Sequence, residues 1–231
     1  MNPRLIIALD YESKQEAMAL VDSLDPSVCA LKVGNELFTR WGTELVSWLI
    51  RRDFNVFLDL KFHDIPNTVA NACKAAADLG VWMLNVHASG GFEMMTAAVL
   101  ALEEYKQEKP LLIGVSVLTS FDSPQLERIG VLKPLATQVM DLAQLAKSAG
   151  LDGIVCSARE VRAIKNLCGV NFIAVTPGIR SETNAIDDQV RVMTPKNALQ
   201  EGSDYLVVGR PITRASDPVM ALHLILQEMI F

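Results

Sequence analysis

The sequence predicts a (β/α)8 barrel of the TIM type, formed as one domain over residues 1–231. Three observations lead to this prediction. Short β-branched runs alternate eight times with segments of helical periodicity, and no antiparallel hairpin signal interrupts them. Charged residues follow several of these runs at their carboxyl ends, where such barrels carry their working residues. A chain of 231 residues suits one large domain, and no low-complexity linker divides it.

In the first half of the chain, each predicted strand is a short apolar run and the helices have recognisable boundaries. Ser13 and Glu16 have the spacing of a capping box, which predicts a helix to about Leu24. Pro66 has the fixed φ that suits a first helical position, and its helix is predicted to reach Leu79. The other two helices are predicted to end near Arg52 and to cover Phe92–Gln107, and the strands are predicted at Leu5–Leu9, Ala30–Val33, Asn55–Lys61 and Trp82–Val86.

Boundary signals are equally regular in the second half. Gly150 is typical of the position just beyond a helix, so it ends the helix predicted over Leu135–Ala149. Three further helix starts are marked by N-cap residues, at Ser157 with Glu160, at Thr194–Pro195 and at Asp217–Pro218. The strands are predicted at Leu111–Leu118, Gly153–Cys156, Asn171–Val175 and Tyr205–Val208.

The composition argues against several classes of function. The net charge of −6 and the lack of a basic stripe argue against nucleic-acid binding. No apolar run approaches the ~18–20 residues of a membrane span, and the apolar stretch near the N-terminus is too short for a signal peptide. Cys29, Cys73, Cys156 and Cys168 lack metal-ligand spacing, so we expect reduced core cysteines in a cytoplasmic protein.

The stretch Asn55–Thr68, which reads NVFLDLKFHDIPNT, is the strongest candidate for a site. Side chains alternate across a strand, so Phe57, Asp59 and Lys61 share one face and the apolar side chains between them share the other. Asp64 follows just beyond the strand end. A structural ion pair would explain these charges equally well in isolation. Their position favours a site, because other strand ends also carry polar residues, namely Asp10, Lys32, Thr119 and Arg210.

The segment of residues 176–193 has no strong regular pattern. Connections longer than ~12–15 residues are uncommon in compact domains and often act as lids. In barrels of this type, the loops after strands seven and eight frequently bind phosphate. Gly209 permits close approach of the backbone, and the planar guanidinium of Arg210 matches phosphate oxygens. We expect Arg180 and Gln189 to close over the same anion, which predicts a small phosphorylated substrate.

Six motifs resemble the orotidine 5′-phosphate decarboxylase family, in order and at matching strand ends across nearly the whole chain. They are IALD at Asp10, KVG at Lys32, DLKFHDIPNTV from Asp59, VLTS at Thr119, TPGIR at Arg180 and VVGRPIT at Arg210. The DLKFHDIPNTV block is highly specific, whereas IALD or VVGRP alone is shared by related phosphate-binding barrels. The resemblance implies a TIM barrel that converts orotidine 5′-monophosphate to uridine 5′-monophosphate and CO₂, the last step of pyrimidine nucleotide synthesis, with no metal and no organic cofactor.

The resemblance also implies roles for individual residues. Lys61 would donate the proton to C6 of the pyrimidine, and Asp59 would lie near the departing carboxylate. Asp64 and Thr68 would reach into the site of a neighbouring subunit, which implies a homodimer with shared sites. The predicted catalytic residues are Lys61, Asp59, Asp64 and Lys32, and the predicted substrate-binding residues are Asp10 and Lys32 at the ribose, Asp59, Thr68, Thr119 at the pyrimidine, and Arg180, Gln189, Gly209 and Arg210 toward the phosphate.

The expected reaction explains why a lysine stands among carboxylates. Loss of CO₂ leaves a carbanion on C6, and an enzyme without an electron-sink cofactor must stabilise that charge by fixed electrostatics. An ammonium group does so and can then deliver a proton. Neighbouring carboxylates favour the charged form of Lys61, which suits an acid and disfavours a Schiff base.

Several alternatives are compatible with parts of the sequence. An open doubly wound sheet would show the same alternation, although no G-x-G-x-x-G follows the first strand. A sugar-phosphate decarboxylase of the 3-keto-gulonate 6-phosphate type would share the Asp-x-Lys strand end but needs Mg²⁺, and a pentose-phosphate epimerase would want more histidine ligands at strand ends. A non-catalytic nucleotide-phosphate sensor would keep Arg210 and Gln189 without needing Asp59, Lys61 and Asp64 together.

Overall fold

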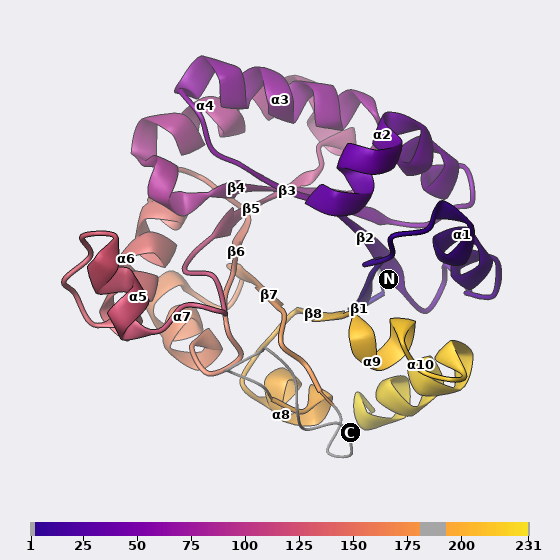
Figure 1. Ribbon diagram of the computed structural model, residues 1–231. Coiled ribbons are helices and arrows are strands. Elements are labelled where there is room, and N and C mark those ends of the chain that lie inside the picture. The colour runs from indigo at the N-terminus through magenta and orange to yellow at the C-terminus, as the bar shows by residue number, and fades with distance from the viewer. Residues whose placement is uncertain (1–2, 181–192, 231) are drawn as a thin grey trace.

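The computed structural model describes residues 3–180 and 193–230, in which eight parallel strands close into a barrel (Figure 1). The strands are β1 (Leu5–Ala8), β2 (Ala30–Gly34), β3 (Val56–Phe62), β4 (Met83–His87), β5 (Leu111–Val115), β6 (Gly153–Val155), β7 (Ile173–Thr176) and β8 (Tyr205–Val208). Each strand pairs with its neighbours in chain order, and β1 closes the ring by pairing Ile6 with Val207 of β8. The prediction of a (β/α)8 barrel is confirmed.

Helices surround the ring of strands (Figure 1). Ser13, Thr194 and Asp217 each accept a hydrogen bond from a backbone N–H in the first helical turn, as their N-cap positions predict. The α-helices are α1 (Lys14–Asp22), α2 (Asn35–Ile50), α3 (Pro66–Asp78), α4 (Phe92–Leu102), α5 (Ser123–Arg128), α6 (Leu135–Ser148), α7 (Val161–Cys168), α8 (Pro195–Gln200), α9 (Arg210–Thr213) and α10 (Pro218–Glu228), and the 3₁₀ helices are η1 (Ala88–Gly90) and η2 (Glu103–Glu108).

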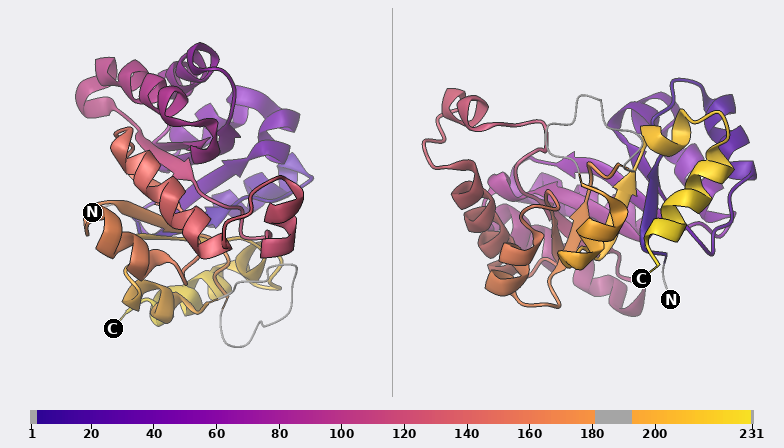
Figure 2. Two further views of the ribbon diagram at one scale, coloured as in Figure 1. Left: turned by 90° about the vertical axis from the view of Figure 1, so that its left-hand side faces the viewer. Right: turned by 90° about the horizontal axis from the view of Figure 1, so that it is seen from below.

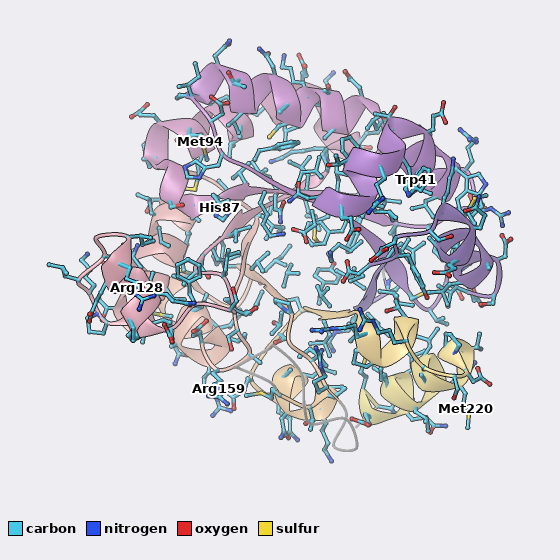
Figure 3. All side chains as sticks on the ribbon, viewed as in Figure 1. Trp41, His87, Met94, Arg128, Arg159 and Met220 are labelled. Atoms are coloured by element: carbon cyan, nitrogen blue, oxygen red, sulfur yellow. The ribbon has the colours of Figure 1, made fainter. Side chains whose placement is uncertain are left out.

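Two apolar layers hold the barrel together. The smaller layer fills the interior of the ring and comprises Ile6, Ala8, Ala30, Phe57, Met83, Ile113, Val175 and Val207. The larger layer joins the outer faces of the strands to the helices and includes Val56 and Leu58. The alternation predicted for β3 is therefore confirmed over residues 56–58. Because side chains fill the ring (Figure 3), a substrate can be bound only at an end of the barrel.

Some element boundaries differ from those predicted. Helices α5 and α9 were not expected, because six and four residues are too few to show helical periodicity. Helix α7 begins at Val161 instead of beside Ser157, although the Glu160 carboxylate accepts a bond from the Ser157 N–H as a capping box requires. Strand β5 ends at Val115, and the Ser116 hydroxyl then donates to the carbonyl of Val155.

The two ends of the barrel differ. Helix α5 stands at the end where the strands have their carboxyl termini, opposite the amino end of β1 (Figure 2). The connections that follow the strands are thus collected at one mouth of the barrel, where the sequence predicts the site. None of the helices in the described part of the chain combines the length and the apolarity that crossing a bilayer demands.

Candidate active site

A cavity of about 230 Å³ opens at the carboxyl ends of the strands. Interior side chains of the barrel form its floor, including Ala8, Phe57 and Val175. Its rim is polar and charged, and it comprises Asp10, Lys32, Asp59, Lys61, Thr119, Arg180 and Arg210 together with Gly178 and Gly209. An apolar floor below a charged rim can hold a flat ring and bind an anionic group at its edge.

A chain of alternating charges crosses this cavity. The Lys61 Nζ lies 2.8 Å from the Asp59 Oδ1, and the Lys32 Nζ lies 3.1 Å from the other carboxylate oxygen of Asp59. The Lys32 Nζ also lies 3.7 Å from the Asp10 Oδ1. Strands β1, β2 and β3 each contribute to this array, because adjacent parallel strands bring their carboxyl ends together.

The charges of this array stabilise one another. Burial by itself raises the pKa of Asp59, but the ammonium groups of Lys32 and Lys61 outweigh burial and bring this pKa below its ordinary value of 3.8. Burial by itself lowers the pKa of Lys32, but the carboxylates of Asp59 and Asp10 raise it above 10.5. Asp59 and Lys32 are therefore both charged at neutral pH.

The backbone of Lys61 has an unusual conformation. Its φ is +52°, in the left-handed region that non-glycine residues rarely adopt. The pairing register between β3 and β4 shifts between Leu58 and Phe62, so the strand bulges at this point. Phe57, Asp59 and Lys61 all line the cavity, so the prediction that they share one face is confirmed, although a bulge that was not predicted lies between Leu58 and Phe62.

Asn85 on β4 is a site residue that sequence reasoning missed. Its side chain is fully buried, its Oδ1 accepts a bond of 2.8 Å from the Lys61 N–H, and its Nδ2 donates a bond of 2.7 Å to the Asp59 Oδ1. A polar residue inside the apolar run MLNVH was the available signal, since a buried amide needs partners.

Asp64 and Thr68 do not join this array. Both residues are exposed and neither lines the cavity. The Asp64 Oδ1 accepts a bond of 2.6 Å from the Ile65 N–H, at the start of α3. Within one chain, Lys61 therefore contacts Asp59, and the exposed Asp64 lies outside the array.

The predicted phosphate side lies on the other half of the rim, where Arg180 and Arg210 line the cavity. The Arg180 N–H donates to the carbonyl of Met193, and the Met193 N–H donates to the carbonyl of Gly178. These bonds hold together the two segments that flank residues 181–192. Gln189, the remaining predicted phosphate-side residue, lies outside the described residues.

Gly209 stands where a side chain would disturb the array. A Cβ atom at this position would lie 3.2 Å from the Asp10 Oδ2 and 3.5 Å from the Ala8 Cβ. Glycine therefore leaves room for the Asp10 carboxylate at this position. The prediction that Gly209 allows close approach is compatible with this crowding.

His63 and His87 lie beside the lysine end of the array. Their ring centroids are 5.4 Å apart, and burial together with the charges of His63 and Lys61 lowers the pKa of His87 below 6.5. His87 is thus neutral at pH 7. Neither histidine lines the cavity.

The fold and the site define the class of protein. A TIM barrel with a buried lysine–aspartate–lysine array at the carboxyl ends of its strands belongs to the class of barrel enzymes that work at that mouth. A family model narrows this class: residues 3–225 match the orotidine 5′-phosphate decarboxylase / HUMPS family, and the chain belongs to that family.

Individual relatives agree with this assignment. The chain is 57% identical over 229 residues to the orotidine 5′-phosphate decarboxylase of Legionella pneumophila (strain Corby), covering 99% of this chain and 100% of the relative. It is 56% identical over 224 residues to the enzyme of the same name from Pseudoalteromonas atlantica, covering 97% of each. Among solved structures, the orotidine 5′-phosphate decarboxylase of Lactobacillus acidophilus matches with a TM-score of 0.88 and 38% identity over 100% of both chains.

Proposed function

We propose that this protein decarboxylates orotidine 5′-monophosphate to uridine 5′-monophosphate and CO₂, and so catalyses the last step of pyrimidine nucleotide synthesis. The observation that carries the proposal is the Lys61–Asp59–Lys32 array above an apolar floor, in a chain that belongs to a decarboxylase family. Relatives that carry the decarboxylase name align with nearly the full length of this chain.

In the proposed reaction the pyrimidine ring lies on the apolar floor and its C6 carboxylate faces Asp59. The bond between C6 and the carboxylate carbon breaks, CO₂ leaves, and the electron pair stays on C6. The Lys61 ammonium stabilises this charge and then transfers one proton to C6. The neutral amine of Lys61 regains its proton from solvent after product release. Each step uses only groups of the chain and water, so the proposal requires no metal and no cofactor.

Asp59 has two effects in this scheme. Its carboxylate holds the two ammonium groups in place, at 2.8 Å from Lys61 and 3.1 Å from Lys32. It also places negative charge near the substrate carboxylate, and this repulsion is relieved as CO₂ departs. The electrostatic attraction between Lys61 and the carbanion is the better-supported of the two effects, because it exists in the transition state and is absent in the ground state.

The remaining predicted residues bind the rest of the nucleotide. Asp10 and Lys32 contact the ribose, and Thr119 contacts the pyrimidine. Arg180, Gln189, Gly209 and Arg210 bind the phosphate, and residues 181–192 of the predicted lid lie outside the described residues. Contacts made by a remote phosphate can contribute to the rate when closure of a loop depends on them.

We further propose that the enzyme is a cytoplasmic homodimer in which Asp64 and Thr68 complete the partner's site. Both residues are exposed at the start of α3, away from the cavity of their own chain. Ile65 between them is 67% exposed, so this part of the surface is accessible to a partner. Most soluble homo-oligomers are two-fold symmetric dimers, which allows two shared sites to form.

Ultraviolet absorbance of orotidine 5′-monophosphate, followed in the presence of the purified protein, tests the proposed function. The spectrum should convert to that of uridine 5′-monophosphate, and the rate should survive EDTA. Conversion that disappears with EDTA and returns with Mg²⁺ would contradict the metal-free reaction, and an absence of conversion would leave a sugar-phosphate decarboxylase of the 3-keto-gulonate 6-phosphate type as the alternative. Binding of the nucleotide without conversion would favour a sensor.

A further inference from the structure

Asn85 occupies the layer of the barrel directly below the charged array. It is the third residue of β4, two positions after Met83, which belongs to the interior layer. Side chains alternate across a strand, so Asn85 shares the inward face with Met83 and lies one step nearer the mouth. Its side chain is fully buried and does not line the substrate cavity. It therefore acts on other protein groups and has no direct contact with a ligand.

The two ends of the Asn85 amide bind the two central residues of the array. The Oδ1 accepts a bond of 2.8 Å from the Lys61 backbone N–H. The Nδ2 donates a bond of 2.7 Å to the Asp59 Oδ1, the same oxygen that lies 2.8 Å from the Lys61 Nζ. One planar group thus fixes both the main chain of Lys61 and the carboxylate against which its ammonium rests.

The bond to the Lys61 backbone compensates for the bulge in β3. The register shift between Leu58 and Phe62 interrupts the regular pairing of β3 with β4 around Lys61. A buried N–H without an acceptor is costly, and the left-handed φ of +52° is unfavourable for a lysine. The Asn85 Oδ1 accepts a hydrogen bond from the Lys61 N–H in this conformation. An extended Lys61 backbone would not direct its N–H toward the same acceptor.

We propose that Asn85 is a positioning residue that aims the Lys61 ammonium at the reacting carbon by holding the bulge of β3 and the carboxylate of Asp59 in one geometry. This inference rests on the proposed decarboxylase function. It adds to that function a residue that makes no contact with substrate and controls where the proton donor stands.

The proposal places a strict requirement on the polarity of residue 85. The group must accept a hydrogen bond on the Lys61 side and donate one on the Asp59 side. Asn85→Leu keeps the branching and the number of side-chain heavy atoms but offers neither, so it leaves two buried polar partners unsatisfied. Asn85→Asp can replace the amide only while its carboxyl is protonated, because the O–H then donates to Asp59 and the carbonyl accepts from Lys61.

The pH profile of Asn85→Asp follows from the charges around this position. Burial and the negative Asp59 both raise the pKa of a carboxyl placed there, whereas Lys61 and Lys32 act in the opposite direction, and His63 and His87 lie beyond Lys61. The protonated form that mimics Asn85 thus exists at low pH. Relative to the wild-type enzyme, activity of Asn85→Asp should be highest in acid and fall as pH rises.

Steady-state kinetics of the full-length enzyme test the proposal. We expect Asn85→Leu to lower kcat about a hundredfold, equivalent to ~2.7 kcal/mol at 1.36 kcal/mol per tenfold change, with KM altered less than about threefold. Ser203→Ala is the matched control, because it removes a buried bond of 2.8 Å to the Thr176 hydroxyl away from the cavity and should leave kcat unchanged.

Any of the following results would overturn the proposal. One is a kcat of Asn85→Leu within about threefold of wild type. Another is a loss confined to KM. If Asn85→Leu does not fold, the pH profile of Asn85→Asp decides, and a ratio of Asn85→Asp activity to wild-type activity that is constant with pH contradicts the inference.

If the wild-type protein itself does not convert orotidine 5′-monophosphate, the proposed function fails. In that case a crystal structure of Asn85→Leu tests the positioning role alone, since it should show Lys61 out of the left-handed region, and an unchanged Lys61 backbone and ammonium position would refute that role.

Discussion

The Asp59 carboxylate is shared by two ammonium groups, with the Lys61 Nζ 2.8 Å from one oxygen and the Lys32 Nζ 3.1 Å from the other. The carboxylate thereby holds both ammonium groups at fixed positions at the mouth of the barrel. Preorganised charge of this kind stabilises a negative charge that develops during reaction, because the protein need not reorganise when the charge appears. The same charges are therefore expected to affect both the free energy of unfolding and kcat.

The array should stabilise the fold in a defined pH range. The folded-state pKa of Asp59 is depressed, so its stabilisation is present above the ordinary value of 3.8 and is lost as pH falls through the depressed pKa. The folded-state pKa of Lys32 is raised, so its stabilisation is present below 10.5 and is lost as pH rises through the raised pKa. Urea unfolding of Lys32→Met should show a loss of about 1.5–3 kcal/mol at pH 7, because Asp59 keeps its contact with Lys61, and this loss should shrink as Asp59 is protonated in acid.

Lys133→Met is the matched control for that measurement. Lys133 also pairs with an aspartate, Asp141, but their side chains are 60% and 46% exposed. An exposed pair of this kind contributes at most ~1 kcal/mol. Equal losses for Lys32→Met and Lys133→Met would contradict the view that the buried array stabilises the barrel.

Arg210 should contribute binding energy that depends on the phosphate. Arg210→Ala is expected to raise KM for orotidine 5′-monophosphate about 10- to 100-fold, since hydrogen bonds to charged groups contribute about 1.5–3 kcal/mol. Affinity for a nucleoside without phosphate should be unchanged. Arg159→Ala is the control, because Arg159 is exposed on the periphery of the molecule (Figure 3). A similar loss of nucleoside affinity in Arg210→Ala would place Arg210 away from the phosphate.

A shared site should allow complementation between inactive subunits. Lys61→Ala and Asp64→Ala are each expected to be nearly inactive, but a heterodimer of the two contains one site with both native residues. After subunit exchange, an equal mixture should regain about a quarter of wild-type activity per subunit. Activity measurements on mixtures with exchange verified by native mass spectrometry test this. If verified heterodimers remain inactive, Asp64 does not act across the interface.

The sequence was sufficient to predict the architecture and the central charges. The runs at Leu5, Val56 and Tyr205 are strands because apolar residues alternate or cluster there between helix boundaries that carry their own capping residues. Asp59 and Lys61 could be placed together because two residues of spacing on a strand bring side chains to one face. Lys32 could be added because neighbouring parallel strands end at the same mouth.

The features that could not be predicted depend on contacts between distant segments. The left-handed backbone of Lys61 arises where β3 and β4 change register, and no local pattern encodes a shift between two strands. Asn85 is 24 residues from Lys61 and 26 from Asp59, so its hydrogen bonds appear only in the folded barrel. Helix α5 differs from these features, because the capping box formed by Asp122 and Gln125 is a local signal from which its start could have been predicted.

The most direct test of the central claim, that the Lys61 ammonium drives the reaction, is to compare turnover and ligand binding in Lys61→Ala. In Lys61→Ala we expect kcat for orotidine 5′-monophosphate to fall below detection, while the Kd for uridine 5′-monophosphate stays within about tenfold of wild type. The exposed variant Lys133→Ala should change neither. Retention of a tenth of wild-type kcat, a barrier change of only ~1.4 kcal/mol, would contradict the assignment of Lys61 as the principal catalyst.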